Sequence, residues 1–435
     1  MYETETKRER FILVAVATLN TPDFDDGEIP PELSELTLLT ETSGGEAAGY
    51  ITQKREAAHP GHYLGKGKLD ELKALIAATN ADGVITDDEL TPAQQRKLSA
   101  LLQVKILDRT MVILDIFAGR AVSAEGKAQV ELAQLRYRLS HLTGLGAQLS
   151  RQAGGGGFHG GGIGTRGPGE KKLETDRRHI RSRIDQLNRE LKEIRENRAV
   201  LRGRRERAGV PVIAIVGYTN AGKSTLMNAL TSAGVPAEDK LFATLDTATR
   251  RLTLPGGTEA LLTDTVGFIH KLPHHLIRAF RATLEEVNFS DLLLHVVDYA
   301  NPAYPAQMEV AYGLLQSLKC LDKPLITAFN KMDAAGRAQG EAPPKDERAN
   351  ASIPISARAG ENIPALLSAL ETAIHAMRGK FTVLIPYNEG QWVSLIHGKC
   401  EVLSETHTES GTRMEVFADA ETAGRLGRFI QNEKD

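Results

Sequence analysis

Short apolar runs alternate with stretches of helical period over the first 120 residues of the chain. The runs have the length of strands and cover residues 11–19, 81–86, 105–107 and 111–117. Apolar residues recur at helical spacing over 69–78 and 92–102, and Thr91 and Pro92 supply a cap and a first turn for the second of these helices. The alternation predicts a small α/β domain over residues 1–120, with the run from Phe11 as its buried first strand.

Two long helices, each with one apolar stripe, are predicted next. Apolar residues keep a spacing of mostly three to four from Ala128 to Leu149, and from Leu173 to Leu201 one recurs every seven positions. The pattern predicts an antiparallel helical hairpin over residues 121–209. Its second helix, about residues 171–207, would be roughly 50 Å long, so its far end would stand away from a compact domain.

The remaining pattern divides at about residue 379. Residues 210–378 contain strand-like apolar runs and helical stretches, and the turn Pro255-Gly256-Gly257 joins two strands as a hairpin. This predicts a domain with a mixed sheet flanked by helices. Residues 379–435 have the pattern of a strand, a helix and a hairpin that turns near Gly411, which predicts a small α+β domain with Trp392 in its core.

Composition and cysteine content limit the class of protein. With 435 residues, 41% of them hydrophobic and 25% charged, the chain fits a soluble globular protein of about three domains, which excludes collagen-like, disordered and disulfide-scaffold classes. Cys320 and Cys400 are expected to be reduced thiols, as is typical of the cytoplasm. No apolar run reaches the roughly 18 to 20 residues that span a bilayer, so no integral membrane segment is expected. Peripheral association with a membrane stays open.

The charge is distributed unevenly along the chain. Between Arg151 and Arg207 there are 16 Lys and Arg against 8 Asp and Glu, although the whole chain has a net charge of -3. The predicted tip of the hairpin, residues 154–169, has the sequence GGGGFHGGGIGTRGPG, with Gly at 10 of 16 positions. We expect a loop that orders on a polyanion such as RNA. The alternatives are a solvated helix of mixed charge and a flexible linker.

A phosphate-binding loop is predicted at VIAIVGYTNAGKS, residues 212–224. An apolar strand runs into Gly217, and four residues later Gly222-Lys223-Ser224 opens a helix. Glycines of such a loop let successive backbone N–H groups face the phosphates, the lysine reaches the β and γ oxygens, and the serine hydroxyl binds Mg²⁺.

Guanine is the base that the next motifs favour. Asn330-Lys331-Met332-Asp333 follows an apolar strand, so its side chains are expected at the carboxyl end of the sheet. The Asp333 carboxylate can accept both N1–H and the 2-amino group of guanine, which adenine lacks, while Asn330 braces the loop. Ser356-Ala357-Arg358, after another strand, offers the Ala357 N–H to guanine O6.

Two further segments are expected to sense the γ-phosphate. Asp264-Thr-Val-Gly267 ends a strand, with Asp264 on a water bound to Mg²⁺ and the Gly267 N–H facing the γ-phosphate. Upstream, Thr244 supplies a second hydroxyl to Mg²⁺, with Thr247 as its rival. Many GTPases have a glutamine that orients the attacking water at the position that Phe268 occupies here. An apolar ring cannot orient water, so hydrolysis is expected to depend on a partner or another cation. The alternative is that Phe268 has a plain packing role.

The expected site residues follow from these motifs. Those expected to bind GTP are Gly217, Tyr218, Thr219, Asn220, Ala221, Gly222, Lys223, Ser224, Thr225, Phe242, Ala243, Thr244, Leu245, Asp246, Asp264, Thr265, Val266, Gly267, Asn330, Lys331, Met332, Asp333, Ser356, Ala357 and Arg358. Lys223, Thr244 and Gly267 are expected to be catalytic. Mg²⁺ is expected on Ser224 and Thr244, and on Asp264 through a water.

The motifs GYTNAGKS, FATLD, DTVGF, NKMD and SAR, in this order, resemble the GTPase domain of translational GTPases. Upstream, HYLGKGKLDELK (62–73), DDELTPAQQRKL (87–98), DRTMVILDIFAGRA (108–121) and GIGTRGPGEKKLETDRR (162–178) are similar to the HflX family of ribosome-associated GTPases. The resemblance covers nearly the whole chain. One departure is Lys171-Lys172 after Glu170, where the family often has a neutral polar pair.

The resemblance implies a GTPase of slow intrinsic rate that the ribosome stimulates. It implies binding to the large ribosomal subunit with the hairpin near the peptidyl-transferase centre, and a role in splitting or rescuing stalled ribosomes. Contacts to rRNA would come from Arg166, Lys171, Lys172, Arg177 and Arg178. The alternatives are a ribosome-assembly GTPase, a GTP-gated regulator of a protein partner, and an RNA-remodelling ATPase.

Two accessory ligands are left open by the resemblance. Asn220 looks like the residue with which related GTPases hold K⁺, although it can equally brace the loop. The resemblance also leaves open weak ATP binding by the N-terminal domain. The segment Gly61–Lys68 is no second phosphate loop, because it has one residue too few between its glycines and no Ser or Thr after Lys66, so we expect a turn there. His59, His62, His159 and His179 lack the spacing of metal ligands.

Overall fold

The computed structural model describes residues 8–17, 31–153, 168–231, 241–242, 248–271, 286–334, 343–418 and 420–431. The chain divides into two compact units. One contains Met1–Glu193, Lys240–Leu245 and Lys271–Arg281, and the other contains Ile194–Asp239, Asp246–His270 and Ala282–Asp435. Two short segments from within residues 210–378 therefore belong to the same unit as the N-terminal domain.

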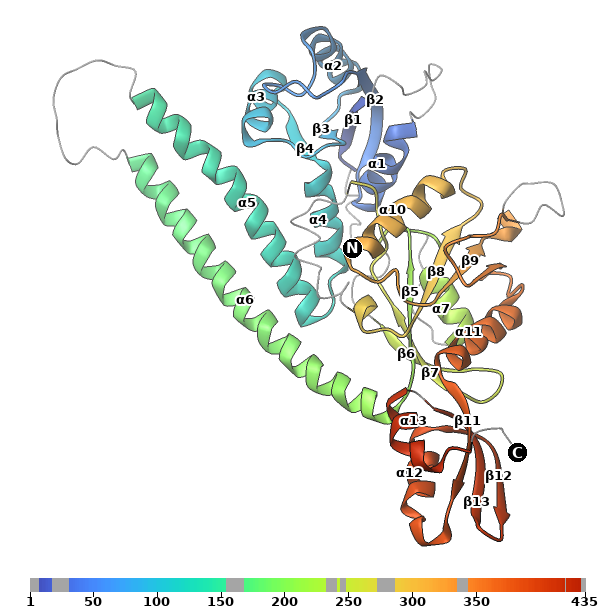
Figure 1. Ribbon diagram of the computed structural model, residues 1–435. Coiled ribbons are helices and arrows are strands. Elements are labelled where there is room, and N and C mark those ends of the chain that lie inside the picture. Colours follow the sequence, from blue (N-terminus) through green and yellow to red (C-terminus); the bar gives the residue numbers. More distant parts are fainter. Residues whose placement is uncertain are drawn as a thin grey trace, which may run out of the picture. The chain divides into compact units, whose positions relative to one another are not determined.

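The N-terminal domain is built on a four-stranded parallel sheet of order β2-β1-β3-β4 (Figure 1). Its strands are β1 (Arg10–Ala17), β2 (Glu46–Lys54), β3 (Gly83–Thr86) and β4 (Lys105–Asp108). Ile12 and Val14 share a core with α2 (Lys66–Thr79) and α3 (Pro92–Leu102). Phe11 and Leu13 alternate with them and are also buried, on the face that α1 (Pro31–Thr42) and α4 (Arg109–Arg120) cover.

The expected strand at 111–117 is wrong, because these residues lie in α4. The Asp108 carboxylate accepts a hydrogen bond of 2.9 Å from the Met111 N–H and caps the helix. Val112, Ile113, Leu114, Ile116 and Phe117 are all buried. A short helix buried on nearly every side shows no polar face, so its apolar run resembles a strand.

The hairpin consists of α5 (Ala124–Ala153) and α6 (Pro168–Ala208) (Figure 1). Arg183 donates two hydrogen bonds of 2.7 Å to the Glu131 carboxylate, and Arg177 donates one of 3.4 Å to the Leu142 carbonyl oxygen. These pairings run in opposite directions along the two helices, so the hairpin is antiparallel. The two helices pack against each other through an apolar cluster of Ala128 and Leu132 from α5 and Leu187 and Leu191 from α6.

The second unit contains a six-stranded sheet of order β10-β9-β8-β5-β7-β6, in which only β6 runs antiparallel to its neighbour. Its strands are β5 (Val212–Gly217), β6 (Thr249–Thr253), β7 (Glu259–Asp264), β8 (Leu292–Asp298), β9 (Leu325–Asn330) and β10 (Ala351–Pro354). Helices α7 (Lys223–Thr231) and α11 (Ile363–Met377) share one core with the sheet, and α10 (Tyr304–Ser317) shares the other. The site residues lie at the carboxyl ends of β5, β7 and β9.

The C-terminal part of this unit is an antiparallel sheet of order β11-β13-β12. Its elements are β11 (Gly379–Ile385), α12 (Gln391–Lys399), β12 (Glu401–Thr408), β13 (Gly411–Ala418) and α13 (Ala420–Leu426). Trp392 is partly buried against its core. The three architectures together confirm the predicted fold class: an N-terminal α/β domain with a helical hairpin, a phosphate-loop domain with a mixed sheet, and a small α+β domain. Within the described residues, no helix has the length and apolar character needed to cross a bilayer.

Candidate nucleotide-binding site

The phosphate loop lies between β5 and α7, and two glycines shape it. Gly217 and Gly222 have φ angles of 148° and 91°, which L side chains rarely adopt. A Cβ on Gly217 would lie 2.2 Å from the Val296 carbonyl oxygen, and one on Gly222 would lie 2.2 Å from Asn330 Nδ2. Both positions therefore require glycine, and a loop of this kind can direct its backbone N–H groups at a phosphate.

Lys223 is the first residue of α7, and its side chain is buried. The ammonium donates hydrogen bonds to the carbonyl oxygens of Gly217, at 3.1 Å, and Tyr218, at 2.7 Å. Burial lowers the pKa of Lys223 to about 8, although the charge of Asp264 opposes the shift. A phosphate group is a stronger acceptor for this ammonium than two carbonyls, so the position suits a phosphate ligand.

Ser224 and Asp264 provide the oxygen atoms for a hard cation. The Ser224 hydroxyl donates to Asp264 Oδ2 at 3.0 Å, and the Asp264 side chain is fully buried, with its other oxygen bonded to the Thr265 N–H at 2.9 Å. Mg²⁺ takes oxygen ligands and usually only one or two from the protein when phosphates supply others, so this pair fits it. The buried Thr219 hydroxyl has no hydrogen-bond partner among the described residues, which is unusual unless a ligand completes the loop.

Asn330 joins the phosphate loop to the second half of the site. Its Nδ2 donates to the Ala221 carbonyl oxygen at 2.9 Å, and its Oδ1 accepts from the Ala357 N–H at 2.9 Å. The Ala357 N–H, which we expected at guanine O6, is therefore paired with Asn330 in the structure. Asp333 is exposed and accepts a hydrogen bond of 2.7 Å from the Ser356 hydroxyl. These contacts bring residues 330, 333, 356 and 357 together.

Asp298, which lies near Asn330 and Lys331, was not among the residues expected from the sequence. Asp298, at the end of β8, accepts a hydrogen bond of 2.8 Å from the Lys331 ammonium. Lys331 has a left-handed backbone, with φ of 65°, which is uncommon for a lysine. The sequence feature that could have identified Asp298 is its position at the carboxyl end of an apolar strand. Asp264 and Asn330 occupy the same position on their own strands.

Gly267 and Phe268 contact the phosphate loop directly. The Phe268 N–H donates to the Gly217 carbonyl oxygen at 3.0 Å, and the Thr219 N–H donates to the Phe268 carbonyl oxygen at 2.7 Å. The Phe268 ring is 2% exposed and lies in a hydrophobic cluster with Tyr218 and Val287. Phe268 thus has the packing role that was one of its two interpretations.

Several expected site residues lie outside the described residues or only partly within them. Ala243, Thr244, Leu245 and Asp246 lie outside, as do the rival Thr247 and the tip with Arg166. Lys171 and Lys172 lie in α6, but their side chains are not described. Arg177 is held in the hairpin by its bond to Leu142, whereas Arg178 is exposed.

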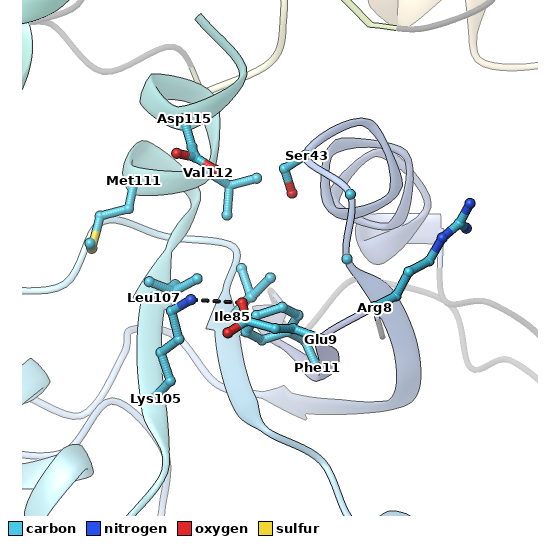
Figure 2. Close-up of a pocket in the computed structure, with 12 residues that line it drawn as sticks. Arg8, Glu9, Phe11, Ser43, Ile85, Lys105, Leu107, Met111, Val112 and Asp115 are labelled. Carbon is cyan, nitrogen blue, oxygen red and sulfur yellow. Dashed lines mark hydrogen bonds and ion pairs between the residues drawn. The ribbon is translucent and has the colours of Figure 1, made fainter. Parts of the chain in front are cut away.

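A cavity of about 550 Å³ lies in the N-terminal domain (Figure 2). Part of its lining precedes or begins the strands, as do Glu9, Gly45 and Lys105, and part comes from α4. The Lys105 ammonium lies 2.7 Å from the Glu9 carboxylate. Ligands of open parallel sheets bind at the carboxyl ends of the strands, which is the opposite edge. The segment Gly61–Lys68 forms a turn that leads into α2 at Lys66, with Tyr63 and Leu64 buried. Neither feature has the form of a nucleotide site.

The sheet order, the strand–loop–helix at residues 212–231 and the Asn330 bridge define a P-loop GTPase. The chain matches three family models: GTP-binding GTPase N-terminal over residues 31–118, GTP-binding GTPase Middle Region over 120–205, and 50S ribosome-binding GTPase over 212–331.

Curated relatives match over nearly the full chain. GTPase HflX of Lacrimispora saccharolytica is 50% identical over 426 residues, which cover 98% of this chain and 97% of that protein. GTPase HflX of Escherichia coli K12 is 39% identical, with 95% and 94% covered. A GTP-binding protein of Sulfolobus solfataricus, solved with GDP, is 22% identical, with a TM-score of 0.43 and coverage of 84% and 98%. The chain belongs to the HflX family of GTPases, as its motifs predicted.

Proposed function

We propose that this chain hydrolyses GTP with Mg²⁺ on the large ribosomal subunit, and that it splits or rescues stalled ribosomes in the cytoplasm. The observation that carries the proposal is the bridge from Asn330 to both the phosphate loop and the 356–357 loop. Asn330 and the phosphate loop lie in residues 212–331, which match the family model of 50S ribosome-binding GTPases. The alternatives are a role in ribosome assembly and GTP-gated regulation of a protein partner. The excess of Lys and Arg in α6 favours an RNA contact over a protein partner.

Different residues of the site bind the phosphates and the base of GTP. Lys223 and the loop N–H groups bind the β and γ phosphates, and the Gly267 N–H donates to the γ-phosphate. Asp333 accepts from guanine N1–H and the 2-amino group, while Asn330 keeps the two halves of the site together. When bound, Mg²⁺ neutralises charge on the phosphate oxygens, and Ser224, Thr244 and, through a water, Asp264 would hold it.

Hydrolysis by the isolated protein is expected to be slow. The Phe268 side chain has no polar atom and is buried, so it cannot orient the attacking water. A group from the ribosome must order that water or stabilise the developing charge. Asn220, with a left-handed φ of 60°, presents an amide at the bend of the phosphate loop, where K⁺ could supply part of this charge.

Steady-state hydrolysis of GTP with and without large ribosomal subunits tests the proposal. We expect a slow rate for the protein alone, a strong rise with large subunits, and a further rise when K⁺ replaces Na⁺. Small subunits at the same concentration serve as the control. Fast hydrolysis in Na⁺ buffer without ribosomes, or a rate that large subunits leave unchanged, would contradict it.

A further inference from the structure

An ion pair lies where two neighbouring strands of the six-stranded sheet end. Strands β8 and β9 are parallel and in register, so Asp298 at the end of β8 lies opposite Asn330 at the end of β9 (Figure 1). The ammonium of the next residue, Lys331, donates to Asp298 Oδ2 at 2.8 Å. The ion pair therefore joins the segment that follows β9 to the end of the neighbouring strand.

The Asp298 carboxylate is held in place by its own segment of the chain. Its second oxygen, Oδ1, accepts a hydrogen bond of 3.1 Å from the Ala300 N–H. The Tyr299 N–H donates to the Asn330 carbonyl oxygen at 3.0 Å, which ties the two strand ends together. The Asp298 side chain is 14% exposed, whereas that of Lys331 is 30% exposed. The carboxylate is thus the fixed partner of the pair, and it determines where the more mobile lysine side chain lies.

Lys331 is held at its backbone as well as at its ammonium. Its carbonyl oxygen accepts a hydrogen bond of 3.0 Å from the Ala334 N–H, and the next residue, Met332, donates from its N–H to the Ile355 carbonyl oxygen at 3.2 Å. Because both ends of the side chain are held, the methylene groups between them are restricted to few rotamers. A lysine loses much conformational freedom when it is ordered, and here the loss occurs on folding rather than on ligand binding.

Lys331 lies beside the residues that we propose to bind guanine. It directly follows Asn330, whose side chain bridges the phosphate loop and Ala357, and it precedes the exposed Asp333 by two positions. Asp333 is proposed to read the edge of the base, which leaves the two flat faces of the ring to be covered by other groups. A lysine can cover such a surface with its methylene groups while its ammonium stays with a polar partner, and Asp298 is that partner here.

We propose that Asp298 is a positioning residue for nucleotide binding, which holds the Lys331 ammonium so that the methylene groups of Lys331 cover one face of the guanine ring. The inference rests on the proposed function and adds to it a residue outside the sequence motifs. The methylene groups contact the face of the ring and not its edge, so their contribution does not depend on the 2-amino group. It does not depend on the γ-phosphate either.

The test uses Asp298→Asn in the full chain, a change that removes the charge and keeps an oxygen for the Ala300 N–H. Titration calorimetry measures the affinities for GDP, for a non-hydrolysable GTP analogue and for inosine diphosphate, which lacks the 2-amino group. We expect each affinity to fall about fivefold, the scale of one partly exposed ion pair. For GTP hydrolysis with large ribosomal subunits, KM should rise by a similar factor and kcat should stay unchanged, because Asp298 does not act on the reacting phosphate.

A double-mutant cycle shows whether Asp298 acts through Lys331. Lys331→Ala should weaken GDP binding at least as much as Asp298→Asn does, and adding Asp298→Asn to Lys331→Ala should bring no further loss. A second fivefold loss in the Lys331→Ala background overturns the proposal, as does wild-type affinity in either single variant. Unequal losses for GDP and inosine diphosphate, or a lower kcat in Asp298→Asn, would assign Asp298 to the base edge or to the chemistry and would also overturn it.

Glu309→Gln is the matched control. Glu309 forms an ion pair of 2.9 Å with Arg348 in the same compact unit, and neither residue is among the expected site residues. This variant should bind GDP with wild-type affinity, and a loss as large as that of Asp298→Asn would refute a specific role for Asp298. Wild-type protein that binds no guanine nucleotide would contradict the proposed function itself, whereas equal binding by wild type and Asp298→Asn refutes only the role of Asp298.

Discussion

At Lys223 the effects of burial and charge oppose one another within the nucleotide site. The pKa of its ammonium is about 8 in the folded protein, below the ordinary value of 10.5, because burial disfavours the charged form. The folded protein therefore holds fewer protons than the unfolded chain between these two values. Stability from this residue rises with pH across that window, whereas phosphate binding requires the proton.

Affinity for GDP is predicted to fall as pH rises from about 7.5 to 9, with proton uptake on binding. Titration calorimetry in buffers of different ionisation heat measures both quantities. Arginine keeps its charge at these pH values, so the GDP affinity of Lys223→Arg should lack the pH dependence that comes from the lysine. Any pH dependence that remains in this variant measures the ionisation of guanine. Equal slopes in wild type and Lys223→Arg, without proton uptake, would show that the ammonium does not titrate in this range.

The spacing of single residues was enough to predict the strand–loop–helix geometry around Lys223 and less of the geometry around Asn330 and Asp333. Gly217, Gly222, Lys223 and Ser224 belong to one continuous segment, so their geometry is local. The bond between Ala357 and Asn330 and the ion pair of Lys331 with Asp298 depend on how separate strands lie beside one another. A single sequence does not specify that arrangement.

At the scale of elements, Phe268 determines how the segment after β7 packs. Phe268→Gln would restore the residue that many GTPases use to orient water, but it would place an amide in an apolar cluster. We expect a loss of about 3 kcal/mol of stability, from the lost ring contacts and the unpaired amide, and no gain in hydrolysis. Scanning calorimetry and single-turnover kinetics measure the two effects.

Phe268→Leu is the companion variant, because it keeps an apolar side chain and should cost less. A Phe268→Gln protein that is as stable as wild type and hydrolyses GTP faster would show that the ring is not needed for packing. In that case a glutamine at position 268 would act in hydrolysis, and the native Phe268 would lower the rate.

Helices and strands could be predicted from the sequence where one of their faces is apolar and the other is polar. The helix 92–102 agrees with its sequence pattern, and Thr91 and Gln94 form the capping box that its start suggests. Strand β2 was not predicted, because its residues are mostly half-exposed at a sheet edge and form no apolar run. Helix α1 was also missed, although Leu33, Leu36 and Leu39 give it a buried stripe at helical spacing.

At the scale of the whole molecule, the structure leaves Arg178 as the exposed cation nearest the tip whose side chain is described. Arg166→Ala with Arg178→Ala is predicted to weaken binding to large subunits and to reduce its salt dependence, because each lost phosphate contact lowers the slope of log affinity against log salt by somewhat less than one. Affinity for GDP should not change. Arg177 is unsuitable for this test, since its loss would also disturb the hairpin.

Pelleting assays over a salt series measure this slope. Replacement of residues 154–167 by a short turn extends the test to the glycine-rich tip. If the tip were a linker, both variants would bind with wild-type affinity and slope.

The central claim is that this chain is a GTPase that recognises guanine through Asp333. Its most direct test is the hydrolysis of GTP and of xanthosine triphosphate, with large ribosomal subunits present, by wild type, Asp333→Asn and Lys223→Ala. We predict that wild type prefers GTP, that Asp333→Asn prefers xanthosine triphosphate because an amide can donate to the additional carbonyl, and that Lys223→Ala hydrolyses neither. Unchanged preference for GTP in Asp333→Asn would contradict the account.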